Sequence, residues 1–188
     1  MTLLGYPSLA GVRPPGRVDE AAPSHLPDGA AASFVVLVTG SRYANDTHLP
    51  LITDRLRRVQ PASGDTRRVV LRHGAAGGTD TLAAYAARTM GWDLDPYPAE
   101  WAHCDKDWCP RRPHRKVSAS GSAYCPLAGQ RRNKAMVDTL PRPDVVVAFP
   151  DRDATPGKSG TLHCLLYAIR QGLHIASVDG LLVKGGHR

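Results

Sequence analysis

RRVVLRHGAAGGTDTLAAYAARTM, residues 67–90, is the stretch of sequence that decides the fold. It starts as a β-branched run and passes through a loop of small residues that contains three glycines. Its last part carries apolar side chains at helical spacing, namely Leu82, Ala83, Ala86 and Met90. The pattern predicts a buried strand over 67–73, a glycine loop and a helix over 79–90.

The glycines of this loop are candidates for ligand binding. If the phosphate of a ligand sits on the helix N-terminus, side chains there would block its approach to the backbone amides. We therefore interpret Gly74, Gly77 and Gly78 as positions kept free for an anionic ligand. The macrodipole alone explains Asp80 in the first helical turn, and a ribose-binding or catalytic role is the alternative.

Strand and helix patterns alternate along the rest of the chain. Buried strands are predicted at FVVLV (34–38) and DVVVAFP (144–150), a weaker strand over 92–99 and a final strand over 174–178. A first helix is predicted after Thr47 as its N-cap, with these apolar positions: Leu49, Ile52, Leu56 and Val59. Two later helices are expected over 127–140 and 160–171. The last should face the core through Leu162, Leu165, Leu166 and Ile169.

This alternation predicts an α/β fold with right-handed crossovers, in the form of a Rossmann-like three-layer sandwich. We expect a parallel sheet of about five strands in the order 3-2-1-4-5. The domain should cover residues 34–178 and include a small insertion at 100–126, where neither a helical nor a strand period is present. Residues 1–33, rich in proline and glycine, are predicted to be a flexible tail, and 179–188 a second tail.

The composition narrows the class of protein and the kind of partner. Lys and Arg number 24 against 17 Asp and Glu, and the resulting charge of +7 favours phosphate-bearing partners. Several arginines occur in short clusters, for which solvated surface is the ordinary explanation. No apolar run is long enough to span a bilayer and no secretory signal is recognised, so we expect a cytoplasmic protein without membrane association.

The loops that follow the strands should meet at one edge of the sheet, where open α/β sheets bind ligands. TGSR (39–42) and PGKSGT (156–161) supply small residues, hydroxyls and amides suited to phosphate. Arg42 is placed to bind a phosphate or carboxylate, with a plain surface arginine as the alternative. The GKS triplet lacks the earlier glycine of a Walker loop, and an ordinary glycine turn is the alternative for PGKSGT.

Taken together, these motifs resemble the SLOG superfamily, and most closely its cpYpsA-related branch, the YspA type. The motifs are VLVTGSR (36–42), HGAAGGTDTLA (73–83), YPAEW (97–101), AGQRRNKAMV (128–137), DVVVAFP (144–150) and GTLHCLLYAIRQGL (160–173). The resemblance implies a Rossmann-like fold that binds nucleotides or nucleotide-derived molecules. The residues that match motif positions are Gly40, Ser41, Arg42, Gly74, Gly77, Gly78, Asp80, Arg132, Asn133, Gly160 and Thr161. Gly157 and Ser159 join them as ligand-binding candidates from their place in the PGKSGT loop.

One departure from the superfamily bears on catalysis. The Lonely Guy phosphoribohydrolases, distant members, carry a glutamate three residues after the motif threonine, whereas this chain has Cys164 there. Asp80, Glu100 or Asp151 could substitute for this carboxylate, and Asp80 and Glu100 are the candidate catalytic residues. Cys164 is expected to be a small core residue, with a reactive thiol as the alternative.

The insertion contains a candidate metal site. Cys104, Cys109, His114 and Cys125 supply three thiolates and one imidazole, which suit tetrahedral zinc. His103 is the alternative fourth ligand, and a loop with unpaired thiols is the alternative to a metal site. Because four protein ligands leave no open position for a catalytic water, we expect a structural zinc.

The sequence thus predicts a module that binds a nucleotide or nucleotide-like small molecule at the edge of its sheet. The first alternative is an N-glycosidase that hydrolyses nucleoside phosphates or dinucleotides. The second is a nucleic-acid-binding protein, supported by the net charge and the basic insertion. The sequence does not determine the oligomeric state, and a homo-oligomer is possible.

Overall fold

The computed structural model describes residues 33–104, 109 and 116–182, and most of them surround one parallel sheet. Its strands are β1 (Ser33–Gly40), β2 (Arg68–His73), β3 (Asp93–Pro96), β6 (Val145–Phe149) and β7 (Ile175–Val178). Their order is β3-β2-β1-β6-β7, and every neighbouring pair is parallel. This is the order 3-2-1-4-5 predicted from the sequence.

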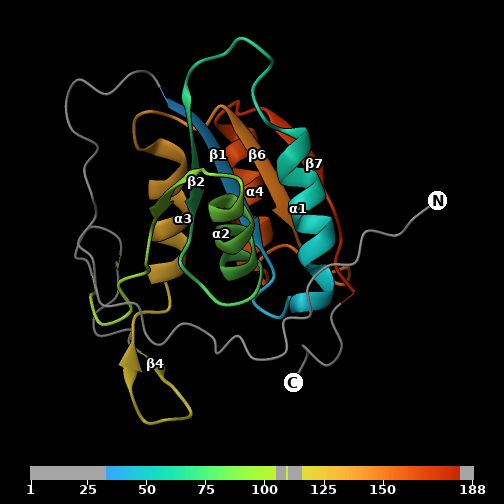
Figure 1. Ribbon diagram of the computed structural model, residues 1–188. Coiled ribbons are helices and arrows are strands. Elements are labelled where there is room, and N and C mark those ends of the chain that lie inside the picture. The colour runs from blue at the N-terminus through green and yellow to red at the C-terminus, as the bar shows by residue number, and fades with distance from the viewer. Residues whose placement is uncertain (1–32, 105–108, 110–115, 183–188) are drawn as a thin grey trace.

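The helices cover both faces of the sheet, as Figure 1 shows with α1 and α2 in front of it and α4 behind. They are α1 (Leu49–Arg58), α2 (Thr79–Thr89), α3 (Ala128–Asp138) and α4 (Gly160–Arg170). Successive β1 side chains point to opposite faces. Val36 and Val38 pack in the core with α1 and α2, whereas Leu37 packs with α3 and α4. The predicted three-layer α/β sandwich is therefore confirmed.

The start of the first helix differs from the prediction. Asn45, rather than Thr47, is the cap: its side chain accepts a hydrogen bond from the Thr47 amide and opens a short 3-10 helix, η1 (Asp46–His48). The α-helix follows from Leu49, with proline in its first turn. Asn45 therefore caps the 3-10 turn, whereas the α-helix that follows, with His48 at its N-cap position, has no side-chain cap among the described residues.

The inward face of α4 is also different. Leu165 is buried as expected, but Leu166 and Ile169 are 38% and 50% exposed, and Cys164 and Ala168 face the core instead. Apolar residues occur almost all round this helix, so hydrophobicity alone does not fix which side faces the sheet.

The predicted tails and insertion are partly described. The N-terminal tail lies outside the described residues apart from Ser33, which begins β1. In the segment assigned to the C-terminal tail, Leu181 is buried, and its backbone pairs with Pro150 and Arg152. The insertion contributes a small antiparallel hairpin of β4 (Lys116–Val117) and β5 (Ala123–Tyr124), and Figure 1 shows β4 projecting away from the sheet. None of the helices in the described part of the chain has the length and apolar character needed to cross a bilayer.

Candidate functional site

A cavity of about 700 Å³ lies at the carboxyl edge of the sheet, between the loops that follow β1 and β6. These two strands are neighbours at the centre of the sheet, where the direction of strand order reverses. Residues 38–43 and 151–161 supply much of the wall, and α2 and α3 supply the rest. We call this hollow the switch-point cavity. Its place is where open α/β sheets bind ligands, and its size is that of a small-molecule site.

Most of the predicted ligand-binding residues line this cavity. They are Gly40, Ser41, Arg42, Gly74, Asp80, Arg132, Asn133, Ser159, Gly160 and Thr161. Gly77, Gly78 and Gly157 are not among its lining residues. Glu100, a candidate catalytic residue, is exposed and does not line it either.

Packing within the protein accounts for three of the glycines. A Cβ at Gly40 would overlap the side chain of Thr79, and one at Gly78 would overlap the backbone of Ser41 and Arg42. A Cβ at Gly74 would overlap the guanidinium of Arg132. The absence of these side chains lets the start of α2 lie against the loop after β1, and lets Arg132 reach the cavity wall.

The loop between β2 and α2 is held by its own buried polar groups. The backbone N–H of Ala75 donates to Nδ1 of His73 at 3.2 Å, and burial lowers the pKa of His73 to about 4. At neutral pH this histidine is therefore an uncharged acceptor.

Asp80 is a buried carboxyl group in the cavity wall. It is 5% exposed, and its Oδ2 accepts a hydrogen bond from the Ala76 amide at 3.1 Å. Burial raises the pKa of Asp80 to about 6, although this amide and the nearby Arg132 favour the charged form. Perturbed carboxyl groups of this kind are common in functional sites.

Two neighbouring residues of α3 connect the cavity to the surrounding loops. Arg132 donates through Nη1 to the carbonyl oxygen of Gly74 and through Nε to Oδ1 of Asn133, the latter at 3.0 Å. Asn133 in turn donates through Nδ2 to the Gly160 carbonyl at 2.9 Å. Burial lowers the pKa of Arg132. The pair thus joins the glycine loop to the start of α4.

The loop before α4 presents both charge and open backbone to the cavity. Ser159 caps the helix, its Oγ accepting from the Leu162 amide at 3.3 Å. Apart from its chain neighbours and the backbone of its own helix, no atom of the described residues lies within 4 Å of the place a Gly160 Cβ would take. Lys158 and Arg42 also line the cavity, as do the carboxylates of Asp151 and Asp153.

Several lining residues were not singled out from the sequence as ligand-binding candidates. They are Tyr43, Met136, Asp151, Asp153, Ala154, Thr155 and Lys158, together with Val38, Thr39 and Ala76. Five of these ten lie inside the quoted motifs, namely Val38, Thr39, Ala76, Met136 and Lys158, and Tyr43, Asp151 and Thr155 directly follow or precede one. Closeness to a motif was the available signal, but it does not tell which way a side chain points.

Cys164 belongs to the core, as the sequence predicted. It is fully buried with Leu37, Met136 and Val146, and burial raises the pKa of its thiol to about 12. This thiol is neutral at physiological pH, so the position supplies neither a carboxylate nor a thiolate.

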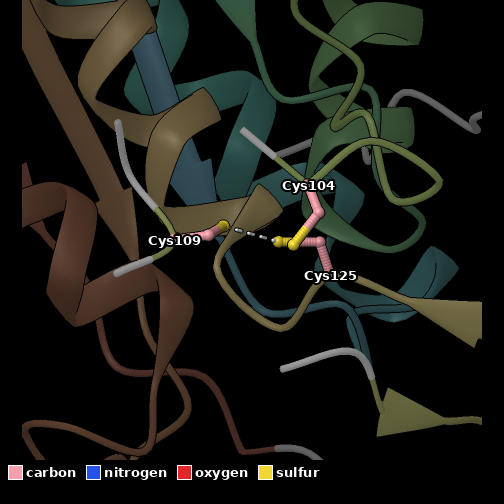
Figure 2. A group of neighbouring side chains, drawn as sticks. All are labelled: Cys104, Cys109 and Cys125. Atoms are coloured by element: carbon pink, nitrogen blue, oxygen red, sulfur yellow. Dashed lines mark hydrogen bonds between the residues drawn. The ribbon is translucent and has the colours of Figure 1, made fainter. Parts of the chain in front are cut away.

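The insertion brings three cysteines together beside α3. Sγ atoms of Cys104, Cys109 and Cys125 all lie within 4.8 Å of one another, and Figure 2 shows the three side chains converging. The distance between the sulfurs of Cys109 and Cys125 is 3.7 Å. Among the described residues, the metal-ligand group at this place consists of these three thiols. His114, the predicted fourth ligand, lies outside the described residues.

Arg131 packs against this cysteine cluster. Its Nη1 lies 3.5 Å from the sulfur of Cys125 and 3.8 Å from that of Cys109. Its Nη2 donates to the carbonyl oxygen of His103 at 2.9 Å, and the His103 side chain is not in the ligand group. A guanidinium here offsets the negative charge that thiolates would carry.

The fold and the cavity define a Rossmann-like α/β protein with a polar cavity at its topological switch point. Residues 34–103 match the model of the YspA, cpYpsA-related SLOG family. This match confirms, over those residues, the resemblance predicted from the sequence.

A solved structure supports the fold over a longer stretch. DNA processing protein A from Streptococcus pneumoniae has a TM-score of 0.53 and 16% sequence identity to this chain. The likeness covers 81% of this chain and 53% of that protein, so the chain spans about half its length. At this identity the similarity shows a shared fold. No curated protein matches the chain in sequence.

Proposed function

We propose that the switch-point cavity binds a nucleotide or nucleotide-derived ligand, and that the protein acts as a sensor or binding module for it. The observation that carries this proposal is the cavity of about 700 Å³ between the loops after β1 and β6. Its volume is within the range of sites that enclose a molecule of this size. The match of residues 34–103 to a SLOG family agrees with a nucleotide-related role.

The charged end of the ligand fits best beside α4. Ser159, Gly160 and Thr161 form the start of this helix, where amide N–H groups and the helix dipole favour an anion. Lys158 and Arg42 line the same cavity and add positive charge. A phosphate is the ligand group that these donors suit.

Asp151, which lines the cavity, also offers a carboxylate oxygen as a hydrogen-bond acceptor. Within the described part of the chain, Oδ1 of Asp151 is buried and has no hydrogen-bond partner. A buried carboxylate oxygen without a hydrogen bond is costly. Because this oxygen is buried, a hydroxyl or amino group of a ligand would reach it only after a movement of the loop that follows β6. The sugar of a nucleotide carries such hydroxyl groups.

Calorimetric titration with 5′-AMP, 5′-GMP, 5′-CMP, 5′-UMP and NAD tests this proposal. We expect at least one to bind, and Arg42→Ala to weaken it about tenfold or more through loss of a charge-assisted hydrogen bond. Arg57→Ala is the matched control, because Arg57 is exposed on α1 and does not line the cavity. Equal effects of the two substitutions, or no binding by the wild-type protein, would contradict the proposal.

Asp80 favours one alternative, hydrolysis of an N-glycosidic bond. It is a buried carboxyl group at the cavity wall with a pKa raised to about 6, which suits acid-base chemistry near neutral pH. The test is release of free base from nucleoside monophosphates or NAD, followed by chromatography. Turnover that falls about a hundredfold or more in Asp80→Asn would replace the binding module by an enzyme. Binding without release of base would support the module.

Nucleic-acid binding is the other alternative. Much of the positive charge in the arginine clusters is paired, since Arg55, Arg58, Arg67 and Arg68 form ion pairs with aspartates. The arginines of the insertion lie outside the described residues. Gel shifts over a salt series address this alternative, and affinity that falls steeply with salt would support it.

We further propose that the cysteine cluster holds a structural zinc ion. Four ligands at about 2.3 Å in a tetrahedron place their sulfurs about 3.8 Å apart. The separation of 3.7 Å between Cys109 and Cys125 agrees with this geometry. Cys104 is the third ligand, and His114 is the fourth by sequence.

Metal analysis of the dialysed protein tests the zinc proposal. We expect about one zinc per chain, and loss of most of it in Cys125→Ser. Cys164→Ser should keep its zinc, because Cys164 lies in the core between α3, α4 and the sheet. Circular dichroism verifies that both variants are folded. Zinc content that does not differ between the two variants would contradict the assignment.

A further inference from the structure

We propose that Tyr43 is the residue that recognises the base of the ligand, by stacking its ring on the nucleobase. This inference rests on the proposed function. Among the described residues that line the switch-point cavity, Tyr43 supplies the aromatic ring. Its side chain is 48% exposed, which leaves ring surface free for a flat apolar partner.

The backbone that carries Tyr43 is fixed from several directions. Its N–H donates to Oγ of Ser41 at 3.0 Å, and Ser41 is itself buried. The Ser41 N–H donates to the Phe149 carbonyl in β6, and its carbonyl accepts from the Thr79 amide at the start of α2. The ring is thus attached to a rigid corner of the fold, so little backbone entropy is lost when a base stacks on it.

Tyr43 also lies on a different loop of the cavity from most of the groups proposed to bind the phosphate. Tyr43 follows β1, whereas Lys158 and the start of α4 follow β6, so the aromatic ring and the anion-binding groups come from different loops. A nucleotide has a flat aromatic base at one end and a phosphate at the other. The two kinds of group in one cavity therefore select for a phosphate that carries a nucleobase, as opposed to a sugar phosphate or inorganic phosphate.

The test compares a ligand that has a base with one that lacks it. Affinities of wild type, Tyr43→Ala and Tyr43→Phe are measured for the four nucleoside monophosphates, and for ribose 5-phosphate directly or by competition. Tyr43→Ala should weaken the nucleotides about tenfold and leave ribose 5-phosphate unchanged, because stacking involves the base alone. Tyr43→Phe keeps the ring and should stay close to wild type.

Tyr85→Ala is the matched control, since Tyr85 is 45% exposed on α2 and does not line the cavity. An equal loss for nucleotides and ribose 5-phosphate in Tyr43→Ala would show that the residue only shapes the loop, and would overturn the inference. No loss for either ligand would overturn it too. If the wild-type protein binds none of the nucleotides, the proposed function itself fails, and this outcome is separate from the other two.

Discussion

Asp80 lies buried in the cavity wall, and its burial lowers the stability of the folded protein when the carboxyl group is ionised. Its pKa is raised from 3.8 to about 6, so the folded protein binds this proton more tightly than the unfolded chain does. A group of this kind lowers stability as the pH rises from about 4 to about 6. A helix N-terminus does not require a carboxylate buried this deeply, which is consistent with a role in binding or catalysis.

We therefore predict a pH-dependent effect of Asp80→Asn. The free energy of unfolding of the variant minus that of the wild type should increase between pH 4 and pH 7, by up to about 3 kcal/mol, because only the wild type loses stability as Asp80 ionises. Urea denaturation at both pH values measures this change. A difference between the two proteins that is the same at pH 4 and pH 7 would show that the Asp80 carboxyl is not perturbed by burial.

Arg72 is the buried charge on which the packing of α3 depends. It is 1% exposed, its Nε donates to Asp95 at 2.7 Å, and its Nη1 donates to the carbonyls of Met136 and Thr139 at the end of α3. Its guanidinium also lies over the ring of Tyr97.

Arg72→Ala should lower the free energy of unfolding by about 3–5 kcal/mol, because it leaves buried carbonyls and a partly buried carboxylate without their partner. Arg68→Ala in the same strand is the control. Arg68 pairs with Asp93 at the surface, where both side chains are largely exposed, so its loss should cost less than about 1 kcal/mol. Similar losses for the two variants in chemical denaturation would be inconsistent with this account.

Among the elements, the loop between β2 and α2 gives the clearest contrast between sequence and structure. The sequence predicted its place and its nearness to a binding site, and Gly74 does line the cavity. It did not predict that Gly78 is small because the backbone of Ser41 and Arg42 lies against it. Contacts between segments far apart in the chain leave no trace in local pattern.

Gly78→Ala should therefore destabilise the protein by about 2 kcal/mol or more. Gly78 has a φ of +70°, and an added Cβ would overlap the neighbouring backbone. Gly77→Ala should change stability by less than about 0.5 kcal/mol, since nothing lies within 4 Å of the added atom and its φ is not positive. Thermal denaturation of the two variants separates them, and equal midpoints would refute the packing explanation.

The buried face was predicted correctly for α1 and α2 but only in part for α4, for a physical reason. In α1 and α2 one face is apolar and the other polar, so the buried positions Ile52, Leu56, Leu82 and Ala83 followed from spacing. In α4 apolar residues surround the axis, and the small Cys164 and Ala168 face the sheet in place of Leu166 and Ile169. Cys164 and Ala168 pack there with Met136 and Val137 of α3 and with the strand residues Leu37 and Val146.

At the scale of the whole molecule, the sheet order and the meeting of the loops could be predicted because parallel strands with right-handed crossovers have few arrangements. The same geometry gathers Ser41, Asp80 and Thr161, which are far apart in the chain, around one cavity. Tyr43 could not be assigned in this way, since the direction of a side chain in a loop depends on tertiary contacts. His114 lies outside the described residues, so the fourth metal ligand stays a prediction.

We propose that a nucleotide binds in the cavity between the loops that follow β1 and β6. The most direct test is a titration of the isotopically labelled protein with the nucleoside monophosphates, followed through its assigned amide resonances. We expect saturable shifts concentrated in residues 39–43, 74–80 and 157–161. Shifts confined to the insertion at 100–126, or no shifts with any of the nucleotides, would contradict it.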